Sequence, residues 1–230
     1  MARTRTLEEL RTECRQRTEM EGSTFIDDAE LTRYLNQSIA KLHGKLVRAY
    51  GDQYFRTAST VSTVAGTDTV VLPTTFFRLL GVDVVIGGIT QSLEPLDWSR
   101  RADYANVGAV WSAGYPIVYS IGASGGKLQL YPTPNGVYSL TMHYIPHATV
   151  LASDSDTFDG YSGWEHYVVL DTCIAMLAKE ESDTKDLRLE RDDVEKQIDD
   201  LAGSRDDGAA WRVQRRWSPR SGTPARGRGW

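Results

Sequence analysis

Apolar positions recur with helical spacing at both ends of the chain and alternate with polar ones in its middle. From Asp27 onward they recur every three to four residues, which predicts a helix of about 22 residues with one buried stripe. The stripe consists of Leu31, Leu35, Ile39, Leu42 and Leu46. Asp27 and Glu30 have capping-box spacing, with Asp replacing the usual Ser or Thr, and Gly51 supplies a left-handed stop after Tyr50.

A shorter helix is expected before this one, from Thr6 to about Met20. Its apolar stripe is narrow and consists of Leu7, Leu10 and Cys14, while most other positions are charged. A helix this short and polar is marginal in isolation, so we expect it to pack against another element.

Two further helices are expected near the C-terminus. The segment WEHYVVLDTCIAMLAKEESD has a broad apolar stripe, which predicts a buried helix. Its stripe consists of Trp164, Tyr167, Val168, Ile174 and Leu177, with Cys173 and Met176 beside it. The run from Thr184 to Leu201 is charged on most faces and has a thin stripe, so it is expected on the surface or along one partner. That stripe consists of Leu187, Val194, Ile198 and Leu201.

Residues 53–146 have the period of two that is typical of strands. Hairpins are predicted around Ala65-Gly66, around Gly87-Gly88 and across residues 123–126. Another is predicted from Gly126 to Tyr144, closed by a type I turn at residues 133–136. In the strand after that turn, Tyr138, Leu140, Met142 and Tyr144 face a core and the alternate residues face water. This pattern indicates an antiparallel sheet rather than βαβ units.

Together these patterns predict an α+β protein, in which a helical core carries an inserted antiparallel β-domain and an extended C-terminal tail. The expected boundaries are residues 1–52 for the N-terminal helices, 53–147 for the β-domain, 148–204 for the C-terminal helices and 205–230 for the tail.

Composition and net charge exclude several classes of protein. The 230 residues carry a formal net charge of −5, which argues against a protein that coats nucleic acid over its whole surface. The two cysteines, Cys14 and Cys173, lie far apart in sequence and form no CxxC, so a disulfide framework is not expected and a reducing cytoplasm is the default. The sequence has no apolar run of membrane-spanning length, and its first residues do not resemble a signal peptide.

The sequence contains no complete catalytic or ligand-binding motif, and each partial match has an ordinary structural explanation. His143 and His147 are separated by a proline at a strand end, which favours a polar pair over a metal site. Asp154, Asp156 and Asp159 match a calcium loop only in part, and a solvated loop before a helix is the ordinary interpretation. No phosphate-binding loop or nucleophile elbow occurs. No cofactor or metal and no enzymatic activity are therefore expected.

The last twenty residues, WRVQRRWSPRSGTPARGRGW, differ from the rest of the chain in composition. Six arginines lie between Arg212 and Arg228 with no acid among them. Three tryptophans are present, and such a segment cannot build a core of its own. Three interpretations stay open: a protein-docking arm, because Trp and Arg are enriched at interface hot spots; a nucleic-acid-binding tail; or an inert tail.

In order along the chain, LTRYLNQSIAKLHGKL, FFRLLGVDVV, LQLYPTP…YSLTMHYIP, WEHYVVLDTCIAMLAKEESD and RDDGAAWRV resemble a known family. The resemblance is to the head-to-tail adaptor, or connector, proteins of tailed bacteriophages. It covers about residues 25–215, and the arginine-rich end after Trp217 has no match in it. The helical core with an inserted β-domain that this family has agrees with the fold predicted from periodicity.

The resemblance implies a structural ring, usually of about twelve copies, beneath the portal protein. Such a ring joins head to tail or nozzle, and genomic DNA passes through its channel without specific binding. The implied location is the head–tail junction of the virion, after assembly in the host cytoplasm and without a membrane. The C-terminal segment is then expected to dock on the portal through Trp211, Val213, Arg215, Arg216, Trp217, Arg220, Arg226, Arg228 and Trp230.

Ten acids lie between Glu180 and Asp200, and an acidic helix there suits a channel lining, which repels DNA phosphates, or a contact between subunits. The candidates are Asp186, Glu190, Asp193, Glu195 and Asp199. Two other functions remain as alternatives. One is nucleic-acid binding through the tail, and the other is a carbohydrate-binding β-module with Tyr104, Trp111, Tyr115 and Tyr119 as stacking platforms.

Overall fold

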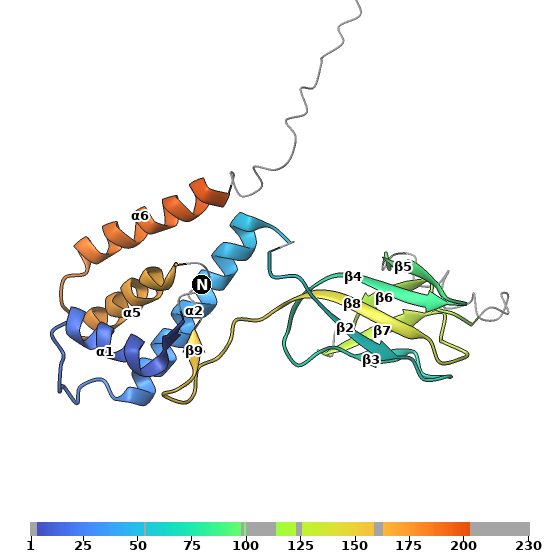
Figure 1. Ribbon diagram of the computed structural model, residues 1–230, viewed down its shortest axis with the longest axis horizontal. Coiled ribbons are helices and arrows are strands. Elements are labelled where there is room, and N and C mark those ends of the chain that lie inside the picture. Colours follow the sequence, from blue (N-terminus) through green and yellow to red (C-terminus); the bar gives the residue numbers. More distant parts are fainter. Residues whose placement is uncertain are drawn as a thin grey trace, which may run out of the picture.

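The computed structural model describes residues 4–52, 54–97, 99, 114–122, 126–158 and 163–202. These residues form two lobes, one built of helices and one built of strands (Figure 1). The chain crosses from the helical lobe to the β-lobe after α2 and returns after β8. The predicted α+β class is confirmed.

The two N-terminal helices begin at residues whose side chains cap them. Helix α1 spans Leu7–Arg17 and starts with a reciprocal capping box between Thr6 and Glu9. Helix α2 spans Asp28–Tyr50, and the Asp27 carboxylate accepts a hydrogen bond from the Glu30 backbone N–H at 2.6 Å. The Glu30 carboxylate turns instead to Tyr34 and Lys179. Gly51, with φ of 75°, ends α2 as predicted.

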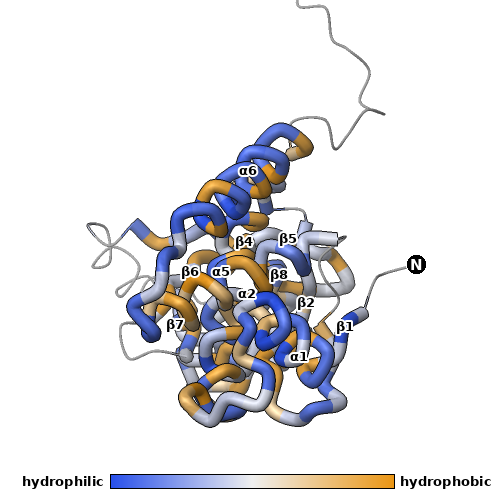
Figure 2. Tube along the Cα trace, turned by 90° about the vertical axis from the view of Figure 1, so that its left-hand side faces the viewer, coloured by the Kyte–Doolittle hydropathy of each residue, from blue (hydrophilic) through white to orange (hydrophobic). Residues whose placement is uncertain are grey.

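Helices α5 (Glu165–Lys179) and α6 (Lys185–Ala202) complete the helical lobe. Helix α5 packs against α1, α2 and α6, and ten of its residues are buried. Helix α6 buries only Val194 and Ile198 and lies across one side of the lobe as a mainly hydrophilic helix (Figure 2). The predicted contrast between a buried helix and a surface helix is therefore confirmed.

One apolar core joins these helices. It includes Leu7, Leu10, Leu35, Leu42 and Tyr167, all almost completely buried. A small pair of strands, β1 (Arg5–Thr6) and β9 (Thr157–Phe158), ties the start of α1 to the loop before α5. The short α1 is thus held by tertiary packing, as its narrow stripe predicted.

The β-lobe is a seven-stranded sheet that bends around a second core. Its strands are β2 (Thr57–Ser62), β3 (Thr69–Val71), β4 (Phe76–Ile86), β5 (Ile89–Pro95), β6 (Val118–Ile121), β7 (Lys127–Tyr131) and β8 (Ser139–Pro146). Their order is β2-β8-β4-β5-β6-β7-β3. Strands β4 and β8 contribute Val82, Val84 and Leu140 to the same cluster as Leu128 and Leu130 of β7, so both halves of the sheet enclose one core.

Two of the predicted hairpins are confirmed and two are wrong. Strands β4 and β5 pair around Gly87-Gly88, and β6 pairs with β7. However, β2 and β3 lie at opposite ends of the strand order, and β7 and β8 also pair with other strands. The connections at residues 63–68 and 132–138 lead from one half of the sheet to the other. Backbone hydrogen bonds between them, from Thr63 to Tyr138 and from Gly66 to Pro134, hold the two connections together.

The sheet is also not wholly antiparallel, because β5 and β6 pair in parallel. The chain between them, residues 96–117, is long enough to return to the starting end, which a parallel neighbour requires. The helical turns suggested for residues 99–106 fall almost entirely outside the described residues. The alternation predicted for β8 is confirmed, with Leu140, Met142 and Tyr144 buried.

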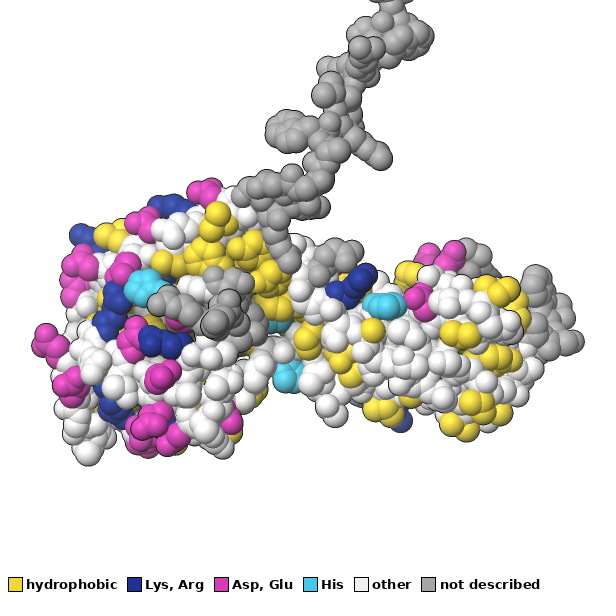
Figure 3. All heavy atoms as spheres, in the orientation of Figure 1, with side chains coloured by type: hydrophobic (Ala, Val, Ile, Leu, Met, Phe, Trp, Pro, Cys, Tyr) yellow, Lys and Arg dark blue, Asp and Glu magenta, His cyan; other side chains and the backbone are white. Residues whose placement is uncertain are grey.

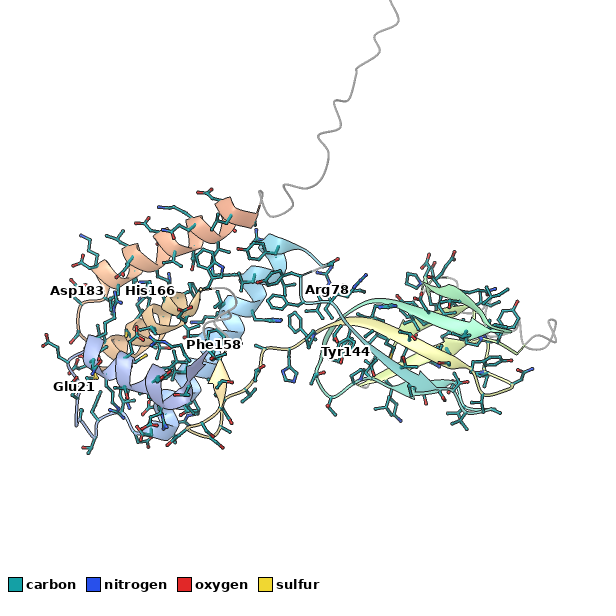
Figure 4. The ribbon with its side chains drawn as sticks, viewed as in Figure 1. Glu21, Arg78, Tyr144, Phe158, His166 and Asp183 are labelled. Atoms are coloured by element: carbon teal, nitrogen blue, oxygen red, sulfur yellow. The ribbon has the colours of Figure 1, made fainter. Side chains whose placement is uncertain are left out.

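Aromatic side chains fill the junction between the lobes. His43 of α2 lies 4.8 Å from Phe55 and 5.5 Å from Phe77, measured between ring centroids. Arg78 of β4 forms an ion pair at 3.0 Å with Asp52, which follows α2. Arg78 and Tyr144 lie at the end of the β-lobe nearest the helices (Figure 4). Burial lowers the pKa of His43, so this ring sits in the junction as a neutral group near neutral pH.

Truncating a leucine in the helical core tests this packing. We expect Leu42→Ala to lower the free energy of unfolding by about 2–5 kcal/mol, because the fully buried side chain leaves a cavity among three helices. Leu189→Ala, on the exposed side of α6, is the control and should change stability by about 0.5 kcal/mol or less. Equal effects of the two substitutions in urea titrations would contradict the assignment of the core.

Candidate functional site

The acidic helix α6 carries the five candidate residues. In the structure, two of them bind basic side chains of other helices and three do not. Glu190 and Glu195 bind basic side chains of the same subunit. Asp186, Asp193 and Asp199 are exposed. The sequence could not make this division, because all five look alike as acids on one amphipathic helix.

Glu190 links α6 to two other helices. Its carboxylate lies 2.5 Å from the Arg17 guanidinium of α1 and 2.8 Å from Nε2 of His166 on α5. His166 lies between α5 and α6 (Figure 4). Burial would raise the pKa of Glu190, but hydrogen bonds from Arg17 and His166 hold it below its usual value. Glu190 therefore connects α6 to α1 and α5, beside the apolar contacts of Val194 and Ile198.

Glu195 has a similar role nearer the C-terminal end of α6. Its carboxylate lies 2.6 Å from Lys45 of α2 and 3.5 Å from Nε of Arg191. A depression of about 270 Å³ lies beside it, lined by Lys45, Arg48, Glu195, Ile198 and Asp199. Acids and bases alternate around this depression, which gives it no strong preference for an ion of either sign.

The exposed acids are available for contacts outside the subunit. Asp193 makes only an intrahelical pair with Lys196 at 2.9 Å, and both side chains are largely solvated. Such a pair contributes little to stability. Asp186 and Asp199 make no ion pair with another residue in the described ranges. These three acids remain candidates for a channel or subunit surface.

Asp171 is a buried charge that sequence reasoning missed. Its carboxylate, 4% exposed, accepts hydrogen bonds from Ser38 at 2.8 Å, Lys41 at 2.7 Å and Arg191 at 3.2 Å. Burial by itself would raise the pKa of Asp171, but the hydrogen bonds from Lys41 and Ser38 together with the cationic neighbours lower it. The single acid within the apolar run VVLDTCIAML was the available signal.

The nine tail residues predicted to dock on the portal lie outside the described residues. They are Trp211, Val213, Arg215, Arg216, Trp217, Arg220, Arg226, Arg228 and Trp230. The structure therefore leaves the docking arm as an expectation from sequence.

The histidines of the β-lobe form ordinary polar contacts. His143 Nε2 lies 3.0 Å from Asp83, whose other oxygen accepts a hydrogen bond from Ser92 at 2.6 Å. These are the residue types of a hydrolytic triad, but the serine bonds to the aspartate rather than to the histidine, so no base activates its hydroxyl. Nδ1 of His147 lies 2.7 Å from the Ala148 carbonyl. Within the described ranges, no group of three metal-ligating side chains comes together.

The aspartates compared with a calcium loop are used by the loop itself. Asp154 pairs with Arg11 of α1. Asp156 accepts backbone hydrogen bonds from Ser153 at 2.9 Å and Ala152 at 2.7 Å, which lower its pKa. Asp159, the third, lies outside the described residues. The part of the loop that is described thus holds α1 and closes on itself.

The four aromatic residues considered as stacking surfaces for carbohydrate differ in their exposure. Tyr119 is buried in the β-lobe core, so its ring is not a surface for stacking, and burial raises its pKa. Tyr115 is half-buried, while Tyr104 and Trp111 lie outside the described residues. The interpretation of Tyr119 as a binding platform is therefore wrong, since its side chain fills a core.

Folding brings the two cysteines together. Cys14 of α1 and Cys173 of α5 are both free and fully buried, and the Cys173 thiol donates to the Cys14 carbonyl oxygen at 3.8 Å. Contact with Cys173 and burial raise the pKa of Cys14, which keeps this thiol protonated and unreactive at neutral pH. The pair therefore packs as small apolar side chains do.

No helix in the described part of the chain combines the length and apolar character needed to cross a bilayer. The described residues form a helical lobe with charged outer faces joined to a β-lobe.

A family model described as SU10 adaptor protein matches residues 5–222. The match spans both lobes and extends beyond residues 25–215, the range over which the sequence motifs resemble the adaptor proteins. The chain belongs to the SU10 adaptor protein family and is a structural adaptor of bacteriophages, as its sequence motifs predicted. A comparison with curated proteins found no match.

Replacing the buried carboxylate tests its structural role. We expect Asp171→Asn to lower the free energy of unfolding at pH 7 by about 3 kcal/mol, because Lys41 and Arg191 lose their shared counter-charge. The exposed Asp193→Asn should change it by about 0.5 kcal/mol or less. Chemical denaturation of both variants measures the difference.

The same residue makes a pH prediction. Because its pKa is lower in the folded state than the value of about 3.9 in the unfolded chain, the stabilisation from Asp171 is complete above that value and is lost as pH falls through the lowered pKa. The wild type should therefore lose stability more steeply than Asp171→Asn below about pH 4. Parallel acid profiles would refute this assignment.

Proposed function

We propose that the protein forms a ring beneath the portal of a tailed phage, joins head to tail and contributes part of the channel for DNA. The ring has about twelve copies, which bind the portal on one side and a tail or nozzle protein on the other. The observation that carries this proposal is membership in an adaptor family over residues 5–222, together with a scaffold that has charged outer faces.

The distribution of surface charge supports a role in binding other protein subunits rather than in catalysis. Acidic and basic side chains are interspersed over the helical lobe, while the visible face of the β-lobe carries fewer of them (Figure 3). A ring of identical subunits needs two different, complementary faces on each copy. The helical lobe offers two unlike faces, because the exposed charged residues of α2 from Ala29 to Arg48 are all basic, whereas those of α6 are mostly acidic.

The C-terminal tail is proposed as the arm that holds the portal. Tryptophans fill pockets in interfaces, and arginines bind carboxylates with paired hydrogen bonds. A polar segment that orders on binding loses entropy, so its few large apolar side chains must supply most of the affinity. Trp211, Trp217 and Trp230 are the anchors expected on this basis.

The ring itself is tested by mass. We expect native mass spectrometry of the purified protein mixed with its portal to detect a complex that contains many copies of both chains. A free monomer in the absence of the portal is compatible with this proposal, since the portal can act as a template. A chain that stays monomeric and does not bind the portal would contradict it.

The docking arm is tested by changing its tryptophans. We expect replacement of Trp211, Trp217 and Trp230 by alanine to weaken co-assembly with the portal by at least about a hundredfold, as loss of two or more hot spots does. A variant with Arg220, Arg226 and Arg228 changed to lysine keeps the charge and is the control, with a much smaller loss. Unchanged co-assembly after deletion of residues 211–230 would reject the arm.

A further inference from the structure

Helix α2 has a solvent-exposed face that carries only positive charge. From Ala29 to Arg48 its exposed residues are Ala29, Arg33, Gln37, Ala40, Lys41, Gly44 and Arg48. We call Arg33, Lys41 and Arg48, with the small residues Ala40 and Gly44 between them, the basic stripe. Arg33 and Arg48 form no ion pair with any residue in the described ranges, and Lys41 stays 58% exposed while it binds Asp171.

The outward face of α6 is mainly acidic, although it also carries Lys196, which pairs with Asp193 at 2.9 Å. Asp186, Asp193 and Asp200 are all exposed and lie seven residues apart, so they form one row along the helix. We call them the acidic row. Asp186 and Asp200 form no ion pair with any other described residue. Leu189 lies on the same face between Asp186 and Asp193 and is 57% exposed.

The two rows match in length and spacing. With a rise of about 1.5 Å per residue, the acidic row places charges about 10.5 Å apart over about 21 Å. Lys41 and Arg48 are also about 10.5 Å apart, and Arg33 lies about 12 Å beyond Lys41, so the basic stripe spans about 22 Å. Three charges on one helix can therefore meet three on the other in a single register.

An antiparallel register also places the apolar groups together. It pairs Arg48 with Asp186, Lys41 with Asp193 and Arg33 with Asp200. Leu189 then lies within about one residue, or 1.5 Å along the axis, of the level of Gly44. The absence of a side chain at Gly44 leaves room for a leucine between Lys41 and Arg48.

Gly44 has no explanation within the subunit. It lies in the interior of α2, where glycine is less stable than alanine, and a Cβ added there would meet no atom within 4 Å. Its backbone does not have the positive φ that favours glycine. A close approach by a helix of another chain would account for it.

We infer that the acidic row of α6 on one copy docks on the basic stripe of α2 on the next copy. This inference rests on the proposed function, because it gives the contact that joins neighbouring subunits of the ring. The acidic row lies on the exposed side of α6, and the basic stripe lies on the exposed side of α2, from which only Lys41 also reaches Asp171 of α5. Each copy therefore presents two different surfaces. Such a head-to-tail contact continues from copy to copy until the ring closes.

Charge reversal tests the contact. Arg33→Glu with Arg48→Glu changes the basic stripe, and Asp186→Arg with Asp200→Arg changes the acidic row. Each pair of substitutions should raise the concentration needed for half-maximal assembly by about tenfold or more, because attraction becomes repulsion. All four substitutions in one chain should restore assembly to within about threefold of the wild type. Lys127→Glu with Arg56→Glu, exposed and outside the helical lobe, is the control and should have no effect.

A steric pair of variants tests the register. Gly44→Trp should weaken assembly by about tenfold or more while leaving the fold intact, because space around Gly44 is open in the subunit. Ala29→Trp lies on the same face but beyond the end of α6 in this register, and it should leave assembly unchanged. Sedimentation velocity, with and without the portal and at low and moderate salt, measures both sets of variants.

The outcomes separate the inference from the proposed function. Rings that form normally from the reversed variants and from Gly44→Trp would overturn this contact and leave the adaptor ring standing. Failure of the wild type to assemble both with and without the portal would overturn both this contact and the adaptor ring. If the basic-stripe reversal removed salt-sensitive DNA binding and left assembly unchanged, the stripe would face DNA, and the contact would again be overturned.

Discussion

The helical lobe depends on one buried carboxylate. Asp171 of α5 is charged inside the protein only because Ser38 and Lys41 of α2 and Arg191 of α6 surround it. These bonds fix α2 and α6 relative to α5, and Glu190 and Glu195 reinforce the same arrangement. The outer faces of α2 and α6 therefore keep a constant spacing, which a subunit that contacts identical neighbours requires.

The division into two lobes follows from two separate apolar cores. The helical core contains side chains of α1, α2, α5 and α6, and the β-core lies inside the bent sheet. Between them lie His43, Phe55 and Phe77 and the ion pair of Arg78 with Asp52. His43 is buried there, Phe55 is partly buried and Phe77 stays 52% exposed, so the rings and the ion pair connect the two lobes without forming a third core.

Local patterns predicted the helices well, because caps, periodicity and a terminal glycine act within a few residues, as Asp27 and Gly51 do for α2. The strand pairs predicted across the turn at Gly87-Gly88 and across the β6–β7 connection are correct. The predicted pairs β2–β3 and β7–β8 are wrong, because the true partners of these strands are distant in sequence. The acids of α6 were identified, but their use was not, because Arg17 and Lys45 reach them only after folding. Asp171 was missed although it is the single acid in an apolar run, because Ser38, Lys41 and Arg191 meet it only after folding. The exposure of Gly44 likewise follows from the packing of α2 and not from local sequence.

The central claim is that this adaptor works through contacts among copies of itself and its neighbours in the particle. Electron cryomicroscopy of the head–tail junction in purified phage particles tests it most directly. The account predicts a ring of this chain between portal and tail, with α6 of each copy against α2 of the next. A junction that lacks the chain altogether would contradict the account.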